Sequence, residues 1–191
     1  LIGPLTINLP GYSAFIQTAW RFQGCAIGII PVWIIFYLYK GEEANFRHDF
    51  SARILLKSFI SAFCFFVWNA GLIVGCSMTL TSHADIMYSS GGVYLLLASL
   101  LLCQPVHMLE ILGYSLYAIG VYMLFTDPFA TKTGMEGQSI LGDVYAFAGA
   151  GFAAIFSYIN STLANEIHPV INLTHCLVFW AIIQMAVFPF F

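Results

Sequence analysis

The chain has 191 residues, of which 60% are hydrophobic and only 8% are charged. Soluble globular proteins carry about 25% charged residues, so a soluble domain is excluded, because too few polar groups are present to cover its surface. The formal net charge of −3 also provides no basic excess for nucleic-acid binding. We therefore expect an integral membrane protein, in the plasma membrane or an endomembrane, whose apolar surface faces the lipid bilayer.

Six stretches of the sequence are apolar over the roughly 20 residues that a helix needs to cross the hydrocarbon core of a membrane. They cover Ser13–Tyr39, Ile54–Cys76, Ala84–Cys103, Met108–Phe125, Gly142–Ala164 and Val170–Phe191. Proline, glycine and charged residues interrupt the apolar sequence between them. The sequence thus predicts an all-α membrane protein that folds as a multi-pass helical bundle.

The connection between the first two stretches carries most of the positive charge. Four of the six lysines and arginines lie in it or beside it, namely Lys40, Arg47, Arg53 and Lys57. The opposite face has Lys132 and, two turns inside the first span, Arg21. Because cytoplasmic loops are enriched in lysine and arginine, we expect the first connection to be cytoplasmic and the loop Asp127–Leu141 to lie outside.

Small residues recur four positions apart in three of the predicted spans. Such spacing lets helices approach closely in lipid, where packing rather than the hydrophobic effect holds them together. The pattern occurs at Gly24 and Gly28, at Gly71 and Gly75, and at Gly149, Ala153 and Ser157, with Gly142, Ala146 and Ala150 adjoining. It predicts a compact bundle, with formation of a homodimer through one such pair as the alternative.

Polar residues follow one face of the first and third spans, which a helix surrounded by lipid does not need. On the first span they are Gln17, Arg21, Gly24, Gly28 and Pro31. On the third span they are Asp85, Tyr88 or Ser89, Gly92, Ser99 and Cys103. Asn69 lies near the middle of the second span, where its amide either faces a polar cavity or forms a hydrogen bond to a neighbouring helix.

Charged residues within the spans have two different settings. Asp85, Glu110 and Asp143 each lie in the first turn of a predicted helix, where the positive end of the helix dipole favours a carboxylate. Arg21 lies eight residues inside the first span, so its guanidinium either faces a cavity or extends along the helix to the membrane surface.

The sequence contains none of the common catalytic motifs, neither a metalloprotease H-E-x-x-H, a hydrolase G-x-S-x-G, nor the glycine-rich loops that bind nucleotides. Its five histidines are scattered over different loops and helix ends. Its five cysteines are odd in number and lack C-x-x-C spacing. We expect no enzyme activity, no cofactor and no metal site.

The segment Thr81-Ser82-His83-Ala84-Asp85 precedes a span that closes in Cys103-Gln104-Pro105. The next span carries the spaced glycines Gly113 and Gly120. This arrangement resembles the end of an EamA repeat in the drug/metabolite transporter superfamily. Gly142-Asp143 resembles the opening of a second repeat, and Trp20-Arg21 the start of the second helix of the first. Gln104 is a departure, since the family often has Glu there, and it leaves Glu110 as a second candidate for the acidic position.

The resemblance implies a fold of ten helices in two inverted halves. Residues 1–127 would then hold the last four helices of the first repeat, 128–141 a connecting loop, and 142–191 the first two helices of the second. We therefore expect the chain to be part of a longer protein. Inverted repeats imply alternating access around a site near the middle of the membrane.

These features predict a carrier for small organic metabolites, with the lipid bilayer and the solute as its partners. The residues expected to line its cavity are Trp68, Asn69, Tyr94 and Tyr145, with Arg21 as a contact for an anion. The tyrosines and the tryptophan could equally be interface anchors or core residues. The alternative function is a scaffold or receptor-like bundle that moves no solute and needs only packing faces.

The charge distribution predicts that Glu42–Asp49 is cytoplasmic and that Gly134–Ser139 is outside. Single cysteines introduced into each segment can be labelled in intact cells with a reagent that does not cross membranes. We expect label at the second segment only, and label at the first only after permeabilisation. Labelling of the first segment in intact cells would reverse the topology.

Overall fold

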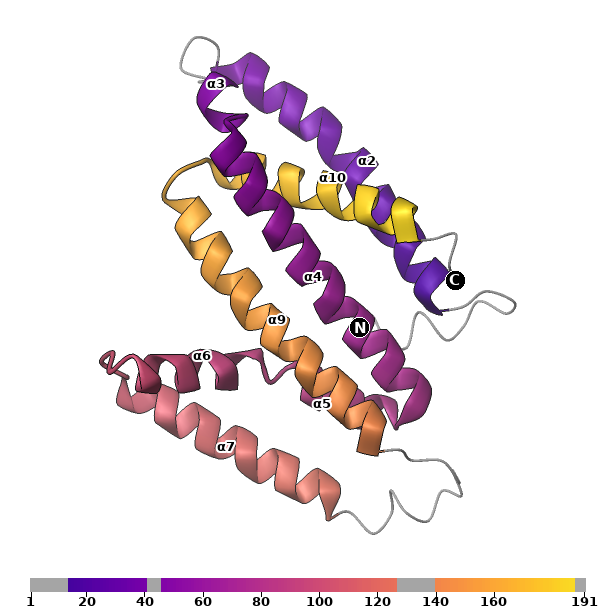
Figure 1. Ribbon diagram of the computed structural model, residues 1–191, viewed down its shortest axis with the longest axis vertical. Coiled ribbons are helices and arrows are strands. Elements are labelled where there is room, and N and C mark those ends of the chain that lie inside the picture. Colours follow the sequence, from indigo (N-terminus) through magenta and orange to yellow (C-terminus); the bar gives the residue numbers. More distant parts are fainter. Residues whose placement is uncertain (1–13, 41–45, 127–139, 188–191) are drawn as a thin grey trace. The chain divides into compact units, whose positions relative to one another are not determined.

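The computed structural model describes residues 14–40, 46–126 and 140–187, and helices make up most of these ranges, with no strand among them (Figure 1). Four single helices, and the segment Thr81–Leu101 taken as a whole, are long and apolar enough to cross a membrane, which gives five candidate spans. The chain is therefore an all-α protein with the helices that an integral membrane protein requires, as the composition predicts.

The helices agree closely with the predicted spans. In chain order they are α2 (Ala14–Lys40), α3 (Phe46–Asp49), α4 (Ala52–Met78), α5 (Thr81–Tyr88), α6 (Gly91–Leu101), α7 (Met108–Phe125), α9 (Ile140–Ala164) and α10 (Pro169–Val187). The bounds of α7 are those predicted, although its apolar part, Met108–Leu124, is shorter than the five spanning segments. The short helix α3 lies in the connection that the sequence left without structure.

Some predictions fall outside the described residues. They concern Ser13, the outer loop Gly134–Ser139, the end of the last span at Phe188–Phe191, and most of the connecting loop 128–141, of which only Ile140 and Leu141 are described, as the start of α9. The side chains of Gln17 and Arg21 also lie outside the description, although both residues belong to α2.

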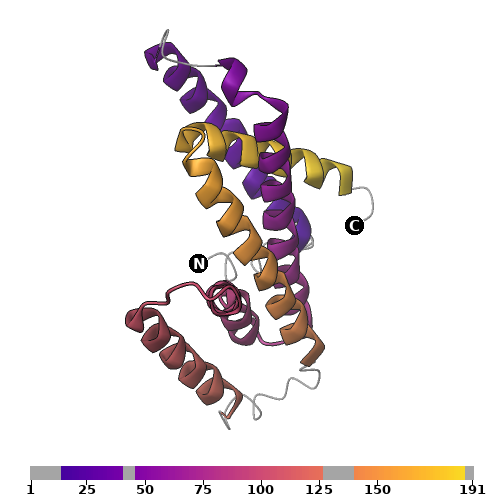
Figure 2. The same ribbon diagram turned by 60° about the vertical axis from the view of Figure 1, so that its left-hand side comes forward.

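The chain divides into two compact units. Unit 1 comprises residues 1–69 and 155–191, and unit 2 comprises residues 70–154. The helices α4 and α9 contribute to both units, and they lie side by side in Figures 1 and 2. The predicted division into two five-helix repeats remains a prediction.

The core of unit 1 is aromatic. Trp180 is completely buried, and its ring lies 3.9 Å from that of Phe22, while Phe22 and Phe65 meet edge to face at 5.5 Å. These rings join α10 to α2 and α4, and α10 packs along α2. Because aromatic pairs add favourable electrostatics to dispersion, this packing stabilises unit 1 without any need to remove apolar surface from water.

The core of unit 2 is a contact between the glycines of α4 and the first half of α9. A Cβ atom built on Gly71 would lie 3.0 Å from Gly149 Cα, and one built on Gly75 would lie 3.0 Å from Ala146 Cβ and 3.1 Å from Gly142 O. A Cβ atom on Gly71 would also lie 2.9 Å from Tyr145 O, so a side chain at either glycine would require α9 to shift. The packing predicted from the spacing of Gly71 and Gly75 is confirmed.

The same prediction is wrong for Gly24 and Gly28. Both residues are exposed, and a Cβ atom on either would meet nothing within 4 Å. The reason is the orientation of α2, which buries Ala26 on the opposite side of the helix, at 7% exposure. Glycines four residues apart allow another helix to approach closely, but no described helix does so at Gly24 and Gly28.

The third predicted span is interrupted rather than continuous, since α5 ends at Tyr88 and α6 begins at Gly91 (Figure 1). At the break the backbone makes tighter bonds, with Ser90 N donating to Met87 O at 3.1 Å and Val93 N to Ser90 O at 2.8 Å. The hydroxyl of Ser90 also donates to Met87 O, at 2.6 Å. Serines that bond to the preceding turn, followed by two glycines, favour a break, so the predicted polar face cannot run the full length of this span.

Two of the three carboxylates expected at helix starts are confirmed. Glu110 lies in the first turn of α7 and Asp143 in the first turn of α9. Asp85 does not, because α5 begins at Thr81, one turn earlier than predicted. The start of α5 has no acidic residue in its first turn.

The close contact of α4 with α9 predicts that Gly75→Leu destabilises the protein, whereas Gly24→Leu is tolerated. Overpacking a tight contact costs about 1–3 kcal/mol, while the open side of α2 can accept a larger side chain. Thermal unfolding in detergent, together with the amount of protein in the membrane, measures both variants. Equal melting temperatures of Gly75→Leu and Gly24→Leu would show that the close contact at Gly75 is not needed for stability.

Candidate functional site

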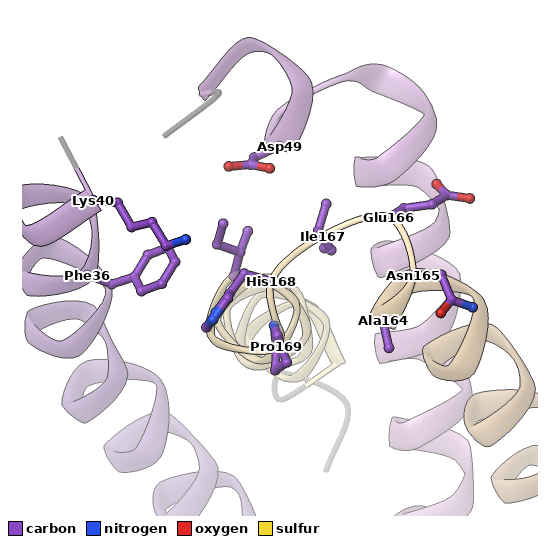
Figure 3. A pocket seen from close by; sticks show the side chains of 10 residues that line it. Phe36, Lys40, Asp49, Ala164, Asn165, Glu166, Ile167, His168 and Pro169 are labelled. Carbon is purple, nitrogen blue, oxygen red and sulfur yellow. The ribbon is translucent and has the colours of Figure 1, made fainter. Parts of the chain in front are cut away.

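A polar pocket of about 360 Å³ lies in unit 1, where α2 ends and where α9 connects to α10 (Figure 3). Its charged or titratable lining residues are Lys40, Asp49, Glu166 and His168. Phe36 provides an aromatic wall. Such a lining offers donors and acceptors of both signs, which suits a small polar solute or headgroup at the end of the helices.

The walls of this pocket are held by specific contacts. Tyr37 Oη donates a hydrogen bond to Asp49 Oδ2 at 2.7 Å, which fixes α3 against α2. The ring of His168 lies 4.4 Å from that of Phe36, and its Nδ1 accepts from Val170 N at 3.3 Å. The histidine thus closes the start of α10 as a cap and also forms part of the pocket wall.

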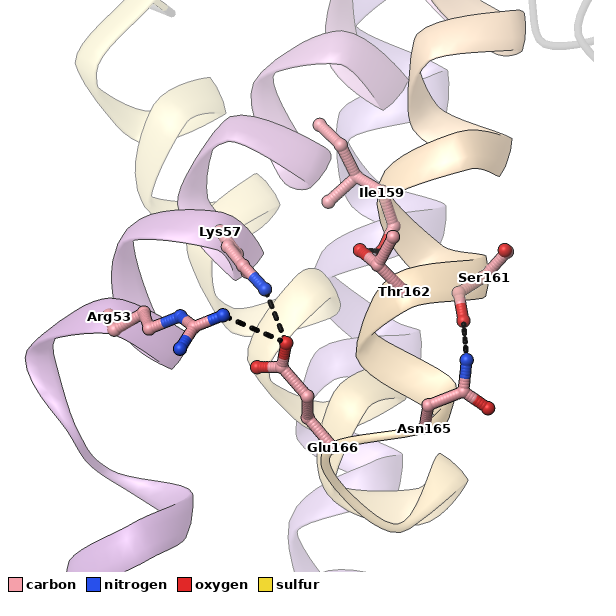
Figure 4. Close-up of polar contacts among 7 residues, drawn as sticks. All are labelled: Arg53, Lys57, Ile159, Ser161, Thr162, Asn165 and Glu166. Atoms are coloured by element: carbon pink, nitrogen blue, oxygen red, sulfur yellow. Dashed lines mark hydrogen bonds and ion pairs between the residues drawn. The ribbon is translucent and has the colours of Figure 1, made fainter.

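Glu166 is the centre of an ion-pair cluster beside the pocket (Figure 4). Lys57 Nζ lies 2.5 Å from Glu166 Oε1, and Arg53 Nη2 lies 3.4 Å from the same oxygen. The hydrogen bond from Lys57, with the charges of Lys57 and Arg53, lowers the pKa of the Glu166 carboxyl. The cluster ties the start of α4 to the loop after α9, so the first and last described connections of unit 1 lie at the same end.

The second-span residues expected in the transport cavity are packed inside unit 1. Asn69 is buried, at 4% exposure, and its Nδ2 donates to Phe65 O of its own helix at 2.8 Å. The ring of Trp68 lies 5.8 Å from Phe65 and 6.2 Å from Phe156. Neither residue lines the polar pocket described above.

The two tyrosines expected in the cavity belong to unit 2. Tyr94 Oη donates to Phe147 O at 3.0 Å, and the two rings are 5.0 Å apart, so Tyr94 joins α6 to α9. Tyr145 is 46% exposed. The structure therefore assigns Trp68 and Asn69 to one unit and Tyr94 and Tyr145 to the other, and their convergence on one cavity remains a prediction.

Sequence reasoning missed the buried pair of His83 and Asp143 in unit 2. Nδ1 of His83 lies 3.7 Å from Oδ2 of Asp143, with side chains that are 7% and 10% exposed. In the sequence they are a scattered histidine and a carboxylate at a helix start. No sequence signal relates the two, which are 60 residues apart.

Metal binding finds no support in the described part of the chain, where no three His, Cys, Asp or Glu residues gather in a way that could hold an ion. The chain matches no protein-family model, no curated protein and no solved structure at a significant level. These comparisons identify no family, so the resemblance to the drug/metabolite transporters remains a prediction, and function must be inferred from the residues themselves.

The ion-pair cluster predicts a pH-dependent effect of Lys57→Gln. Because the pKa of Glu166 is lower in the folded protein, its stabilising contribution is present above the unfolded-state value of about 4.3 and is lost as the pH falls further. We expect Lys57→Gln to lower the melting temperature at neutral pH, and the difference from wild type to shrink in acid.

Arg53→Gln is the matched control, because Arg53 is 76% exposed and its distance to Glu166 is longer. We expect Arg53→Gln to lower the melting temperature less than Lys57→Gln does at every pH, since exposed ion pairs contribute little to stability. Melting curves in detergent over a pH series compare the variants. A Lys57→Gln difference that stays constant into acid would show that Glu166 is not its partner.

Proposed function

We propose that the protein is a multi-pass membrane carrier that moves small organic metabolites by alternating access, in the manner of the drug/metabolite transporters that its sequence resembles. The observation that carries the proposal is the interrupted span formed by α5 and α6. Irregular backbone at membrane depth is tolerated only where it is buried in protein or lines a water-filled cavity, and transporters use it at their binding sites.

The groups around the interruption support this reading. Ser90 at the break is 1% exposed, and Tyr117 Oη of α7 donates to Ile86 O at 2.9 Å, a carbonyl that also accepts from Ser89 N at 3.1 Å. A Cβ atom on Gly92 would lie 2.7 Å from Tyr114 Oη. Two tyrosine hydroxyls of α7 thus lie against the broken segment, where a solute could replace them as hydrogen-bond partners.

Buried polar side chains in apolar helices give further support. Ser58 and Gln184 are almost completely buried, yet each has a polar oxygen with no hydrogen-bond partner. Polar groups inside membrane helices are costly unless they serve a cavity or a pathway. A bundle that served only as a scaffold would have no need of them.

The alternative function, a scaffold or receptor-like bundle, is favoured by one observation. An apolar groove of about 310 Å³ runs between α2 and α10, with Ile27, Ile30 and Met185 in its lining. Such a groove accepts a lipid chain or a partner helix equally well. A carrier also has lipid-facing grooves, whereas a scaffold has no reason to interrupt a span, so we prefer the carrier.

Transport is tested with the purified protein in vesicles, screened against amino acids, nucleotide sugars and other small metabolites. We expect Asn69→Leu to slow uptake about tenfold at matched protein amount, because a buried amide contact is lost, and Asn69→Gln to slow it less. Ser115→Leu, a change on the exposed surface of α7, is the control and should have no effect.

Uptake by Asn69→Leu at the wild-type rate and apparent affinity would contradict a role for Asn69 in transport, although the carrier function itself would remain supported. Absence of uptake by wild type across the whole panel would favour the scaffold.

A further inference from the structure

The pair formed by His83 and Asp143 differs from every other charged contact of the described chain in its depth. His83 lies in the first turn of α5 and Asp143 in the first turn of α9, and both residues are more than nine-tenths buried. The ion pairs of Glu166 are much more exposed, with side chains at 27% and 76% on the basic partners. A buried charge without a partner of opposite sign is strongly destabilising, so the charges of these two buried side chains affect the stability of unit 2.

Both residues of the pair adjoin close contacts between helices. Asp143 follows Gly142, where a Cβ atom would lie 2.9 Å from Met78 Cβ and 3.1 Å from Gly75 O. His83 precedes Ala84, which is completely buried in the cluster that joins α4, α5 and α9. The pair therefore lies next to the glycine contact of α4 with α9.

Unit 2 contains no lysine and no arginine in its described residues, 70–126 and 140–154. The titratable groups on these helices include Cys76 on α4, Asp85 and Tyr88 on α5, Tyr117 on α7 and Tyr145 on α9, none of which can carry a positive charge. The other histidine in the described residues of unit 2, His107, is the N-cap of α7, where its Nδ1 accepts from Leu109 N at 3.2 Å. His83 is therefore the residue able to carry a positive charge that lies beside Asp143.

One oxygen of the pair has no hydrogen-bond partner. Oδ1 of Asp143 is buried without one, while Oδ2 is the oxygen that lies beside His83. Buried polar groups usually have partners, so an exception calls for an explanation such as a functional role or a bound water. A proton-binding role of the pair provides such an explanation.

We propose that His83 and Asp143 form a proton-binding site whose occupancy drives the conformational cycle of the carrier, so that transport is coupled to protons. The inference rests on the proposed carrier function for its coupling role. One proton from the solvent binds the imidazole, no covalent bond other than N–H forms, and the net charge of the pair changes from −1 to 0.

The physical basis of the coupling is a difference in stability between two states. With the proton bound, the imidazolium and the carboxylate stabilise each other, and α5 stays packed on α9. Without the proton, the buried carboxylate has no positive charge beside it. The conformation in which water reaches the space between α5 and α9 is then favoured. Histidine is suited to this role, because its charge changes within the physiological pH range.

The binding step is tested without any solute. Purified protein in detergent is brought from about pH 8 to about pH 5 with a pH-indicator dye, and the protons taken up per chain are counted. We expect Asp143→Asn and His83→Gln each to take up about one proton fewer than wild type. Asp85→Asn, an exposed carboxylate on the same helix as His83, is the control and should match wild type.

The coupling step is tested in vesicles with the solute identified by the uptake screen. Acid on one side should accelerate wild-type and Asp85→Asn uptake, and Asp143→Asn should lose this response. If the wild-type uptake rate does not depend on the pH gradient, proton coupling is contradicted and the carrier function remains supported. If wild type moves no solute but the proton counts differ as expected, the carrier is overturned and the proton site stands.

Equal proton uptake by wild type and both folded site variants would overturn the site itself. Folding is checked by gel filtration and by the melting temperature. If Asp143→Asn does not fold, His83→Gln and Asp143→Glu replace it. Asp143→Glu keeps the carboxylate and should retain the proton count.

Discussion

The contact between α4 and α9 at Gly71 and Gly75 positions most of unit 2. In lipid the hydrophobic effect does not hold helices together, so their stability depends on how closely their surfaces meet. Without side chains at these positions the two backbones approach to van der Waals distance over two turns. The contact also determines where Asp143 lies, one residue after Gly142, and hence where His83 finds a partner. A larger residue at either glycine would separate all of these groups together.

The helices could be predicted because membrane spans are specified by simple physics. A helix is needed to satisfy its own backbone, and proline and glycine end it, so α7 was predicted to the residue and α4 to within two. The break at Ser89 and Ser90 was not predicted, because the apolar residues on both sides of it read as one continuous span. The two serines and the two glycines after them favour a break, but whether the helix is interrupted depends on the hydroxyl contacts that the serines make.

Spacing alone also could not separate Gly71 and Gly75 from Gly24 and Gly28. Both pairs permit close approach, and only the tertiary arrangement decides that α9 covers one pair and that no described helix covers the other. The same limit applies to the site. Asn69 was expected in the transport cavity, which remains a prediction, and its amide donates to Phe65 O, four residues earlier in the same helix. The partner of Asp143, His83, lies 60 residues away, so that pair depends on a contact between distant segments.

The aromatic core of unit 1 also makes the protein a natural subject for fluorescence. Trp180 is sealed inside the core with Phe22 at 3.9 Å, whereas Trp20 is 50% exposed on α2. The indole of Trp180 is therefore shielded from water-soluble and lipid-borne quenchers alike, while that of Trp20 is accessible from the surface. Trp33 and Trp68, the other two tryptophans, are half-buried and belong to the same unit, so its emission combines core, intermediate and surface signals, and quenching suppresses that of Trp20 first.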